Sequence, residues 1–171
     1  MHDQLPVYTI QFMRMSEGVE WALHTCLNLA WVGPERAVTA ARLAAFYDLP
    51  PAYLGKQLQA LTRAGVVSSS PGPRGGFRLA REPGAITLMD IVAAIEGPEK
   101  AFRCSEIRHR GPQSQISQVT DHPCHVSRYM REAELAWRRQ LAARTLTDLQ
   151  HTVVRSSPGI PERTREWFLA Q

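Results

Sequence analysis

The chain has 171 residues, of which 44% are hydrophobic and 21% charged, a composition typical of a globular protein with one hydrophobic core. Its formal net charge of +4 favours an anionic partner such as a nucleic acid over a cationic one. Three cysteines without an apolar leader predict a cytoplasmic protein with reduced thiols, and no apolar run is long enough to cross a membrane.

Residues 1–15 show no hydrophobic period and are predicted to form an N-terminal extension. A helix is expected to begin at Ser16 and to end before Gly33, because apolar residues recur at helical spacing between them. Cys26 belongs to this apolar stripe and is interpreted as a core residue, since a free cysteine packs like a small hydrophobic side chain. The stripe consists of Val19, Leu23, Cys26 and Ala30.

Two short helices are expected next, at residues 39–47 and 51–64, and the tight turn between them suggests a helix-turn-helix. Two short strands at 66–69 and 77–79 flank a loop rich in glycine and proline, which predicts a hairpin with Arg74 near its tip. Helices followed by such a hairpin indicate a winged helix. The predicted fold is therefore mainly helical with a small β-hairpin wing, and its DNA-binding domain spans residues 16–97.

The C-terminal half is expected to contain a helix at 87–96, a loop at 98–123, a dimerisation helix at 124–150 and a peripheral tail at 151–171. The loop has no hydrophobic period, and a loop of this length is typically functional or mobile. The dimerisation helix is inferred from an apolar stripe that favours packing against a partner helix. This stripe consists of Val126, Met130, Ala133 and Trp137.

Basic residues are concentrated between positions 51 and 82, where five of them accompany the single acid Glu82. A local basic patch favours a nucleic-acid interface, although charge alone is equally typical of a solvated surface. One side of the second short helix offers groups for phosphates and base edges, and the glycines allow the wing backbone to approach DNA. The candidate DNA-binding residues are Tyr53, Lys56, Gln57, Arg74, Gly75 and Gly76.

The run AYLGKQLQALTRAGVVSSSPGPRGGFRLAREPGAITLMDIVAAIEGP resembles the IscR/NsrR/RsrR family of winged-helix bacterial transcription regulators, and the resemblance extends from about Ser16 to Leu149. It implies a homodimer that binds a pseudo-palindromic operator in double-stranded DNA and has no enzymatic activity. One departure concerns the wing, because Pro71 stands where relatives often have arginine and Arg74 follows three residues later. This departure affects which operator sequence is bound.

Regulators of this family commonly hold an iron-sulfur cluster on three cysteines of a short loop, whereas this loop has only Cys104 and Cys124, separated by 19 residues. The run SEGVEWALHTC and the wide cysteine spacing look like the RsrR branch. That resemblance implies a 2Fe-2S cluster held by Cys104 and Cys124 of one subunit and by Glu20 and His24 of the other. Spacing alone favours a surface pair for Glu20 and His24 over a metal site, and it is the resemblance that makes them ligands. Trp21, next to Glu20, is a candidate switch residue.

Other readings remain open, among them a plain dimeric repressor that has lost its cofactor. A zinc site would combine Cys104 and Cys124 with a histidine from the set His109, His122 and His125. A thiol switch would instead join the two cysteines in a reversible disulfide, which requires their Cα atoms to lie close together. An enzyme is not expected, because no thiol or serine has an evident base and no phosphate-binding glycine loop is present.

Overall fold

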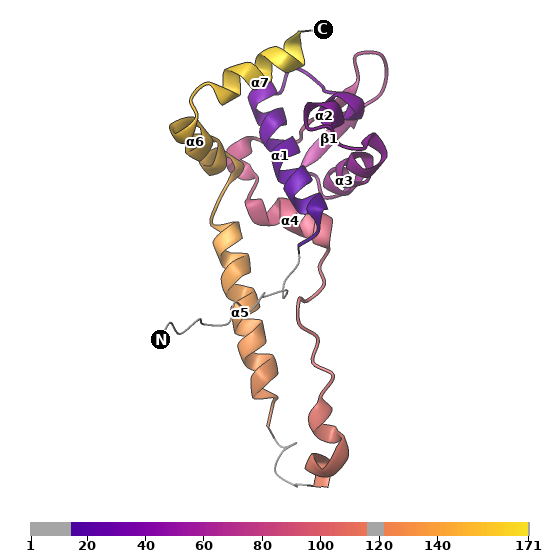
Figure 1. Ribbon diagram of the computed structural model, residues 1–171, viewed down its shortest axis with the longest axis vertical. Coiled ribbons are helices and arrows are strands. Elements are labelled where there is room, and N and C mark those ends of the chain that lie inside the picture. Colours follow the sequence, from indigo (N-terminus) through magenta and orange to yellow (C-terminus); the bar gives the residue numbers. More distant parts are fainter. Residues whose placement is uncertain (1–14, 116–121, 171) are drawn as a thin grey trace, which may run out of the picture.

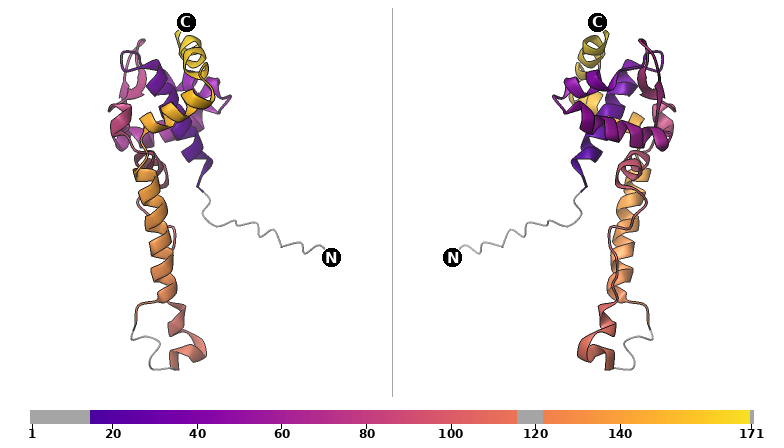
Figure 2. Two further views of the ribbon diagram at one scale, coloured as in Figure 1. Left: turned by 90° about the vertical axis from the view of Figure 1, so that its left-hand side faces the viewer. Right: turned by 90° about the vertical axis from the view of Figure 1, so that its right-hand side faces the viewer.

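A computed structural model describes residues 15–115 and 122–170 (Figure 1). The predicted extension lies outside these residues except for Met15. The chain forms a helical lobe, from which one long helix projects, and the segment that precedes this helix runs back beside it (Figures 1 and 2). The helices and strands are α1 (Glu17–Val32), α2 (Ala40–Phe46), α3 (Pro51–Arg63), β1 (Val67–Ser70), β2 (Gly76–Leu79), α4 (Leu88–Glu96), α5 (His125–Ala142), α6 (Leu146–Ser156) and α7 (Ile160–Leu169).

The helix α1 lies at the centre of the lobe, with α3, α4, α6 and α7 packed around it. It is apolar on several sides for this reason, and Ala22 and Cys26 are completely buried. Ser16 and Gly33 end the helix as the sequence predicts, with Gly33 in the positive-φ region at 93°. The outer face of the helix carries Glu20 and His24, which are exposed, whereas Thr25 and Asn28 are polar residues buried within the lobe.

The helices α2 and α3 form the predicted helix-turn-helix, and β1 and β2 form the predicted antiparallel hairpin. Phe77 of β2 also pairs with Val38, so that the hairpin is attached to the start of α2. Gly76 adopts a φ of 142°, and a Cβ atom there would lie 2.6 Å from the Val38 carbonyl group. The arrangement confirms the mainly helical winged-helix fold.

The single long helix expected from Cys124 to Leu149 is wrong, because the chain breaks between α5 and α6. At the break, the Leu146 N–H group donates to the Ile86 carbonyl and the Leu88 N–H group donates to the Arg144 carbonyl, each at 2.8 Å. The Leu146 N–H group and the Arg144 carbonyl group are therefore bonded to another segment and not within a continuous helix. Thr145 then begins α6 with a capping box to Asp148, which a continuous helix would not use.

The peripheral tail expected at 151–171 is also wrong. The helix α7 packs against α1, and Phe168 is only 2% exposed in the same core as the helix-turn-helix. Its ring stacks on Phe46 of α2 with centroids 5.0 Å apart. The apolar stripe of α7 covers only a short segment of sequence. Hydrophobic periodicity therefore did not predict that this helix contributes to the core. Among the described residues, no helix is both long and apolar enough to span a bilayer.

Candidate nucleic-acid interface and metal site

The exposed face of α3 carries the predicted recognition residues. Tyr53 is 57% exposed, and the Lys56 ammonium group lies 5.3 Å from the centre of its ring. Gln57 is only half-exposed, because its amide lies over Gly18 of α1, where an added Cβ would be 2.7 Å from the Gln57 Nε2 atom. Tyr53 and Lys56 are therefore available to a ligand, whereas Gln57 is partly engaged within the lobe.

Trp21 of α1 contacts the recognition helix directly. Its ring meets the Tyr53 ring edge to face, with centroids 6.5 Å apart. Trp21 also follows Glu20 in the sequence, so that it stands between a candidate metal ligand and a candidate DNA contact. Trp21 thus joins α1 and α3 by a direct ring contact beside Glu20.

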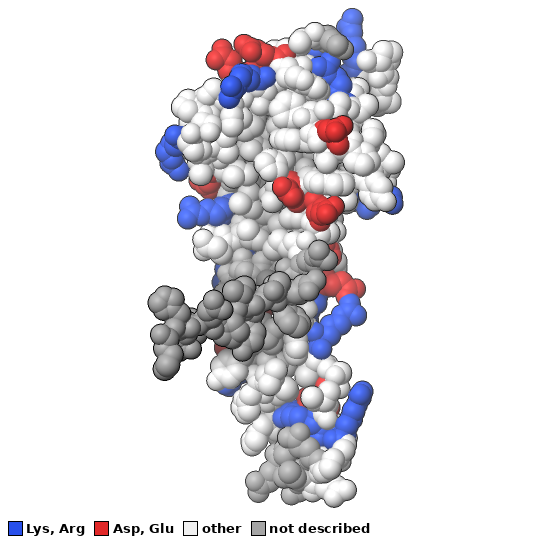
Figure 3. Space-filling view, in the orientation of Figure 1, with Lys and Arg blue, Asp and Glu red and all other residues white. Residues whose placement is uncertain are grey.

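The wing adds a second basic surface, which sequence reasoning found only in part. Arg74 is exposed and lines a groove of about 470 Å³ together with Arg36, Arg42 and Arg78. Arg36 and Arg42 were missed because the first 50 residues are net acidic, and only the folded chain brings them to the wing. On the face drawn in Figure 3, the centre of the lobe is mostly uncharged and the basic side chains lie at its margins.

Arg42 is held in this groove by α7. Its guanidinium donates to the Trp167 carbonyl at 2.8 Å and lies 5.2 Å from the centre of the Trp167 ring. Arg78 donates to the Ser70 hydroxyl at 3.4 Å across the hairpin. Gly75 is buried, and an added Cβ there would be 2.2 Å from the Ser70 carbonyl oxygen, so this position has no room for a side chain. The backbone of the wing is thus closely packed beside the exposed Arg74 side chain.

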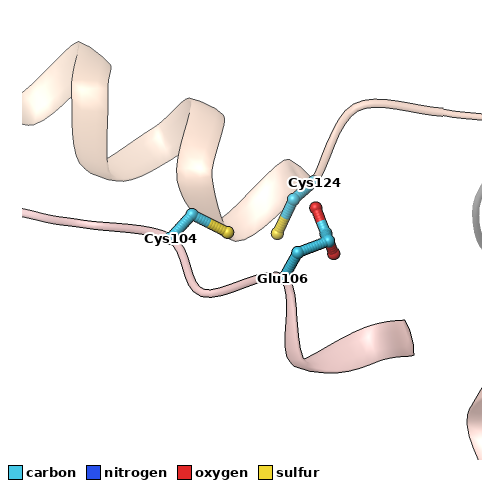
Figure 4. Close-up of side chains that lie close together, drawn as sticks. All are labelled: Cys104, Glu106 and Cys124. Carbon is cyan, nitrogen blue, oxygen red and sulfur yellow. The ribbon is translucent and has the colours of Figure 1, made fainter. Parts of the chain in front are cut away.

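At the far end of α5, Cys104 and Cys124 come together with Glu106 (Figure 4). The donor atoms of the three residues lie within 4.8 Å of one another. Cys124 is the N-cap residue of α5, and the backbone N–H group of Ser127 lowers the pKa of its thiol, with a smaller contribution from Cys104. A helix N-terminus favours the thiolate, which is the form that binds metals.

Glu106 is a candidate site residue that sequence reasoning missed. A hydrogen bond from Arg108 lowers the pKa of its carboxyl group, and the Arg108 Nη2 atom lies 2.9 Å from Glu106 Oε2. The same nitrogen donates to the His122 carbonyl at 3.1 Å, which ties the two sides of the loop together. Glu106 lies two residues after Cys104, and this short spacing was the signal available in the sequence.

The other two predicted ligands, Glu20 and His24, lie in the helical lobe and not beside the cysteines (Figure 1). The 18 residues of α5 span roughly 27 Å at 1.5 Å per residue, so one chain does not bring the four residues together. The His24 Nδ1 atom is 3.5 Å from the Tyr47 hydroxyl, which donates to Asn28 Oδ1 at 3.2 Å. Glu20 and His24 also line an apolar groove of about 490 Å³ between α1 and α6.

The remaining cysteine and histidines fall outside the candidate metal site. Cys26 is completely buried, as predicted, and desolvation raises the pKa of its thiol to about 12. His109, His122 and His125 are exposed, and within residues 15–115 and 122–170 none of them joins Cys104, Glu106 and Cys124 in a metal-binding group.

An apolar face of α5 is exposed to solvent in the single chain. Val126 is 63% exposed, Tyr129 61% and Met130 41%. Isolated exposed apolar residues are common, but a contiguous set on one helix is typical of an interaction surface. Two of these residues, Val126 and Met130, belong to the stripe predicted from the sequence.

Comparison with known proteins agrees with this fold. The chain is 32% identical over 137 residues to an HTH-type transcriptional regulator of Aquifex aeolicus, covering 80% of this chain and 91% of that protein. It is 28% identical to protein rrf2 of Nitratidesulfovibrio vulgaris, covering 80% and 87%. The regulator CymR of Bacillus subtilis superposes with a TM-score of 0.60 at 26% identity, over 82% of this chain and 98% of CymR.

The fold is also that of T. potens IscR, which superposes with a TM-score of 0.65 at 21% identity, over 85% of this chain and 91% of IscR. The Aquifex aeolicus protein and CymR are named as regulators, in agreement with the sequence prediction of a regulator and not an enzyme. The Rrf2 profile, described as an iron-dependent transcriptional regulator, matches residues 15–152. The chain therefore belongs to the Rrf2 family of DNA-binding transcriptional regulators.

Proposed function

We propose that the chain is a homodimeric, cytoplasmic transcriptional regulator that senses redox state through a 2Fe-2S cluster shared between two subunits. The observation that carries this proposal is the pairing of Cys104 and Cys124 at one end of α5, remote from Glu20 and His24 of the same chain. Each set is an incomplete ligand shell alone. Two copies in opposite orientation would complete two shells, each with two thiolates, one carboxylate and one imidazole.

The donor set fits such a cluster. Thiolates hold iron-sulfur clusters, and imidazole replaces them at one iron in some 2Fe-2S centres. The lowered pKa of the Cys124 thiol makes its thiolate more accessible than that of an ordinary cysteine. The Tyr47 hydroxyl stands at the Nδ1 atom of His24, which leaves the Nε2 atom for a metal. When bound, a 2Fe-2S cluster supplies a one-electron redox couple.

The groove beside Glu20 and His24 would accommodate the cysteine loop of a second copy. It is lined by apolar side chains such as Leu23 and Leu149, and the loop presents Ile107, which is 68% exposed. The exposed apolar face of α5 supplies further surface for the same dimer. This arrangement supports the assignment of residues 98–123 as the cluster loop and of α5 as the main dimerisation element.

The recognition surface has a direct link to the proposed ligands. Trp21 packs on Tyr53 and adjoins Glu20, so a change in the ligation of Glu20 would reach α3 through one side chain. In this proposal Tyr53 and Lys56 contact the major groove, and Arg74 contacts a phosphate or the minor groove while Gly75 and Gly76 shape the wing. A two-fold dimer would bind a pseudo-palindromic operator.

The test is the visible absorption spectrum of protein purified without oxygen, with iron, acid-labile sulfide and zinc assayed on the same sample. We expect iron and sulfide in equal amounts and bleaching with dithionite. The variants Cys104→Ala and Cys124→Ala should lose the cluster, whereas the matched control Cys26→Ala should retain it because Cys26 is a core residue. A colourless protein after anaerobic reconstitution would contradict the proposal.

A second candidate function rests on the proximity of Cys104, Glu106 and Cys124 within one chain. Two thiolates and a carboxylate are suitable zinc ligands, and the two thiols, whose sulfur atoms lie within 4.8 Å of each other, would instead form a reversible disulfide in a thiol switch. Either would make the chain a dimeric winged-helix repressor without iron and sulfide. The metal assay distinguishes the three cases, since zinc at one equivalent, or no metal with a disulfide in oxidised protein, replaces iron and sulfide.

A further inference from the structure

A second cavity lies beside the helix-turn-helix, in the helical lobe and far from Cys104 and Cys124. It has a volume of about 550 Å³ and is formed by residues of α1, α2, α6 and α7, together with Tyr47 at the end of α2. Its walls are mainly aromatic and aliphatic, with Trp31, Phe46 and Trp167 as the largest side chains. The volume falls in the range of pockets that hold small organic molecules, which are typically apolar with a few polar groups.

The polar groups of this cavity are few and basic or neutral. Arg163 of α7 lines it, together with His24, Tyr47 and Thr164. The Arg163 side chain is exposed, and within residues 15–115 and 122–170 no carboxylate pairs with it. Among the residues that the structure describes, none of those lining the cavity is acidic. A guanidinium next to an apolar cavity with no acid is complementary to an anion that carries an apolar body.

We propose that this cavity binds a small aromatic carboxylate. Its ring would pack against Trp31, Phe46 and Trp167, and its carboxylate would accept hydrogen bonds from the Arg163 guanidinium. Aromatic rings attract one another edge to face, and these walls already contain such a contact, between Phe46 and Trp167 with centroids 5.0 Å apart. An aliphatic acid would lose these ring contacts, and a neutral aromatic molecule would leave the guanidinium unpaired.

The position of the cavity makes it suitable for an effector. Phe46 and Tyr47 end α2, immediately before the turn that leads into the recognition helix, whereas Ile160 and Trp167 belong to the C-terminal helix α7. An occupant would therefore contact both parts of the lobe. The site does not depend on the proposed cluster, although it shares His24 with it, so its test is made on protein without iron.

The first measurement is isothermal titration of the full-length apo-protein with sodium benzoate. Its companion is tryptophan fluorescence of the variant Trp21→Phe/Trp137→Phe, in which only the cavity residues Trp31 and Trp167 remain of the four tryptophans. We expect saturable binding by both methods with the same dissociation constant. Benzyl alcohol and hexanoate, which lack the charge and the ring respectively, should bind more weakly.

The decisive variant is Arg163→Gln, which keeps an exposed polar side chain and should fold normally. A charge-assisted hydrogen bond contributes enough that we expect benzoate affinity to fall about tenfold. The matched control is Arg155→Gln on α6, which removes an exposed arginine that does not line the cavity and should leave affinity unchanged. Val153→Phe, which adds volume at the cavity wall, should also prevent binding.

Absence of binding at millimolar benzoate would overturn the proposal. Unchanged affinity in both Arg163→Gln and Val153→Phe would overturn it as well, because the binding would then occur elsewhere. Equal affinities for benzoate and hexanoate would contradict the aromatic specificity. None of these results bears on the iron and sulfide assay, so the two proposals fail independently.

Discussion

Thr87 and Thr145 face each other across an isolated antiparallel bridge, and each begins the helix that follows it with a capping box. The Thr145 hydroxyl oxygen accepts from the Asp148 N–H at 3.1 Å, and Asp148 Oδ2 accepts from the Thr145 N–H at 2.8 Å. Thr87 and Asp90 make the equivalent bonds, each at 3.0 Å. This paired start of α4 and α6 attaches the C-terminal helices to the DNA-binding lobe.

Replacing Thr145 by alanine should destabilise the protein by about 1 kcal/mol, the usual contribution of an N-cap side chain. The Asp148 N–H group would then lose its acceptor. Thermal and urea unfolding of Thr145→Ala measure the effect, with Gln140→Ala at an exposed position of α5 as the control. Equal stability of the two variants would show that the cap is dispensable.

The capping box of Thr145 and Asp148 should also make the free energy of unfolding depend on pH in the acidic range. The backbone N–H group of Thr145 lowers the pKa of the Asp148 carboxyl group in the folded chain. The unfolded chain therefore binds the proton more readily than the folded chain does. The stabilisation by ionised Asp148 is complete above the ordinary aspartate pKa and is lost as the pH falls through the lowered pKa of the folded chain. Urea unfolding between pH 6 and pH 3 should show a smaller acid loss in Asp148→Asn than in the native chain.

Local signals explain how much of the fold was predictable. The helix starts at Ser16, Thr39 and Thr87 and the strands on both sides of the wing loop depend on nearby residues, so the sequence predicts them correctly. The break before Thr145 depends on pairing with a segment almost 60 residues earlier. The burial of Phe168 likewise requires α7 to reach α1 and α2 from the other end of the chain. Hydrophobic periodicity within one segment predicts neither the helix break before Thr145 nor the burial of Phe168.

Cys124 should be the most reactive thiol of the apo-protein. Backbone N–H groups at the start of α5 lower its pKa, whereas burial raises that of Cys26 to about 12. The alkylation rate with iodoacetamide should therefore rise with pH around a midpoint below that of a free cysteine. Cys104→Ala should shift this midpoint upward, because the Cys104 thiol also stabilises the thiolate. Modification of Cys26 under native conditions would contradict the assignment.

Mixing two defective variants tests whether the cluster is shared between subunits. One variant is Cys104→Ala/Cys124→Ala, and the other is Glu20→Ala/His24→Ala. Neither homodimer can complete a shared site, but their heterodimer contains one complete site. Reconstitution of tagged heterodimers should therefore restore about half of the native iron content per dimer. Colourless heterodimers would show that the four residues do not act together across the interface.

Lys56 should contribute a phosphate contact to DNA binding. The variant Lys56→Ala is expected to lower the slope of log affinity against log salt concentration by about 0.9, the value for one phosphate contact. Lys100→Ala, which removes an exposed lysine from the segment after α4, should leave the slope unchanged. The measurement uses a duplex selected from a random pool. Identical slopes for the two variants would remove Lys56 from the interface.

The sequence predicted those residues of the candidate sites whose type is itself informative, such as cysteine, and missed those whose role depends on neighbours in space. Cys104 and Cys124 were identified from their isolation in one loop, and the structure brings them together. Glu106 was missed because a single acid near a cysteine is common, and Arg108, which holds it, gives no sequence signal. Arg36 and Arg42 were missed because their neighbours in the sequence are acidic, while their neighbours in space are the wing arginines.

The packing of α7 also bears on how this protein folds during synthesis. Phe168 completes a core to which α1, α2 and α3 contribute many residues, and the ribosome makes these helices much earlier. The nascent helix-turn-helix therefore exposes Phe46 until residues 160–169 have been translated and have left the ribosome. A nonsense mutation before this segment would leave every proposed DNA-contacting residue in place, yet it would yield a lobe prone to aggregation and proteolysis.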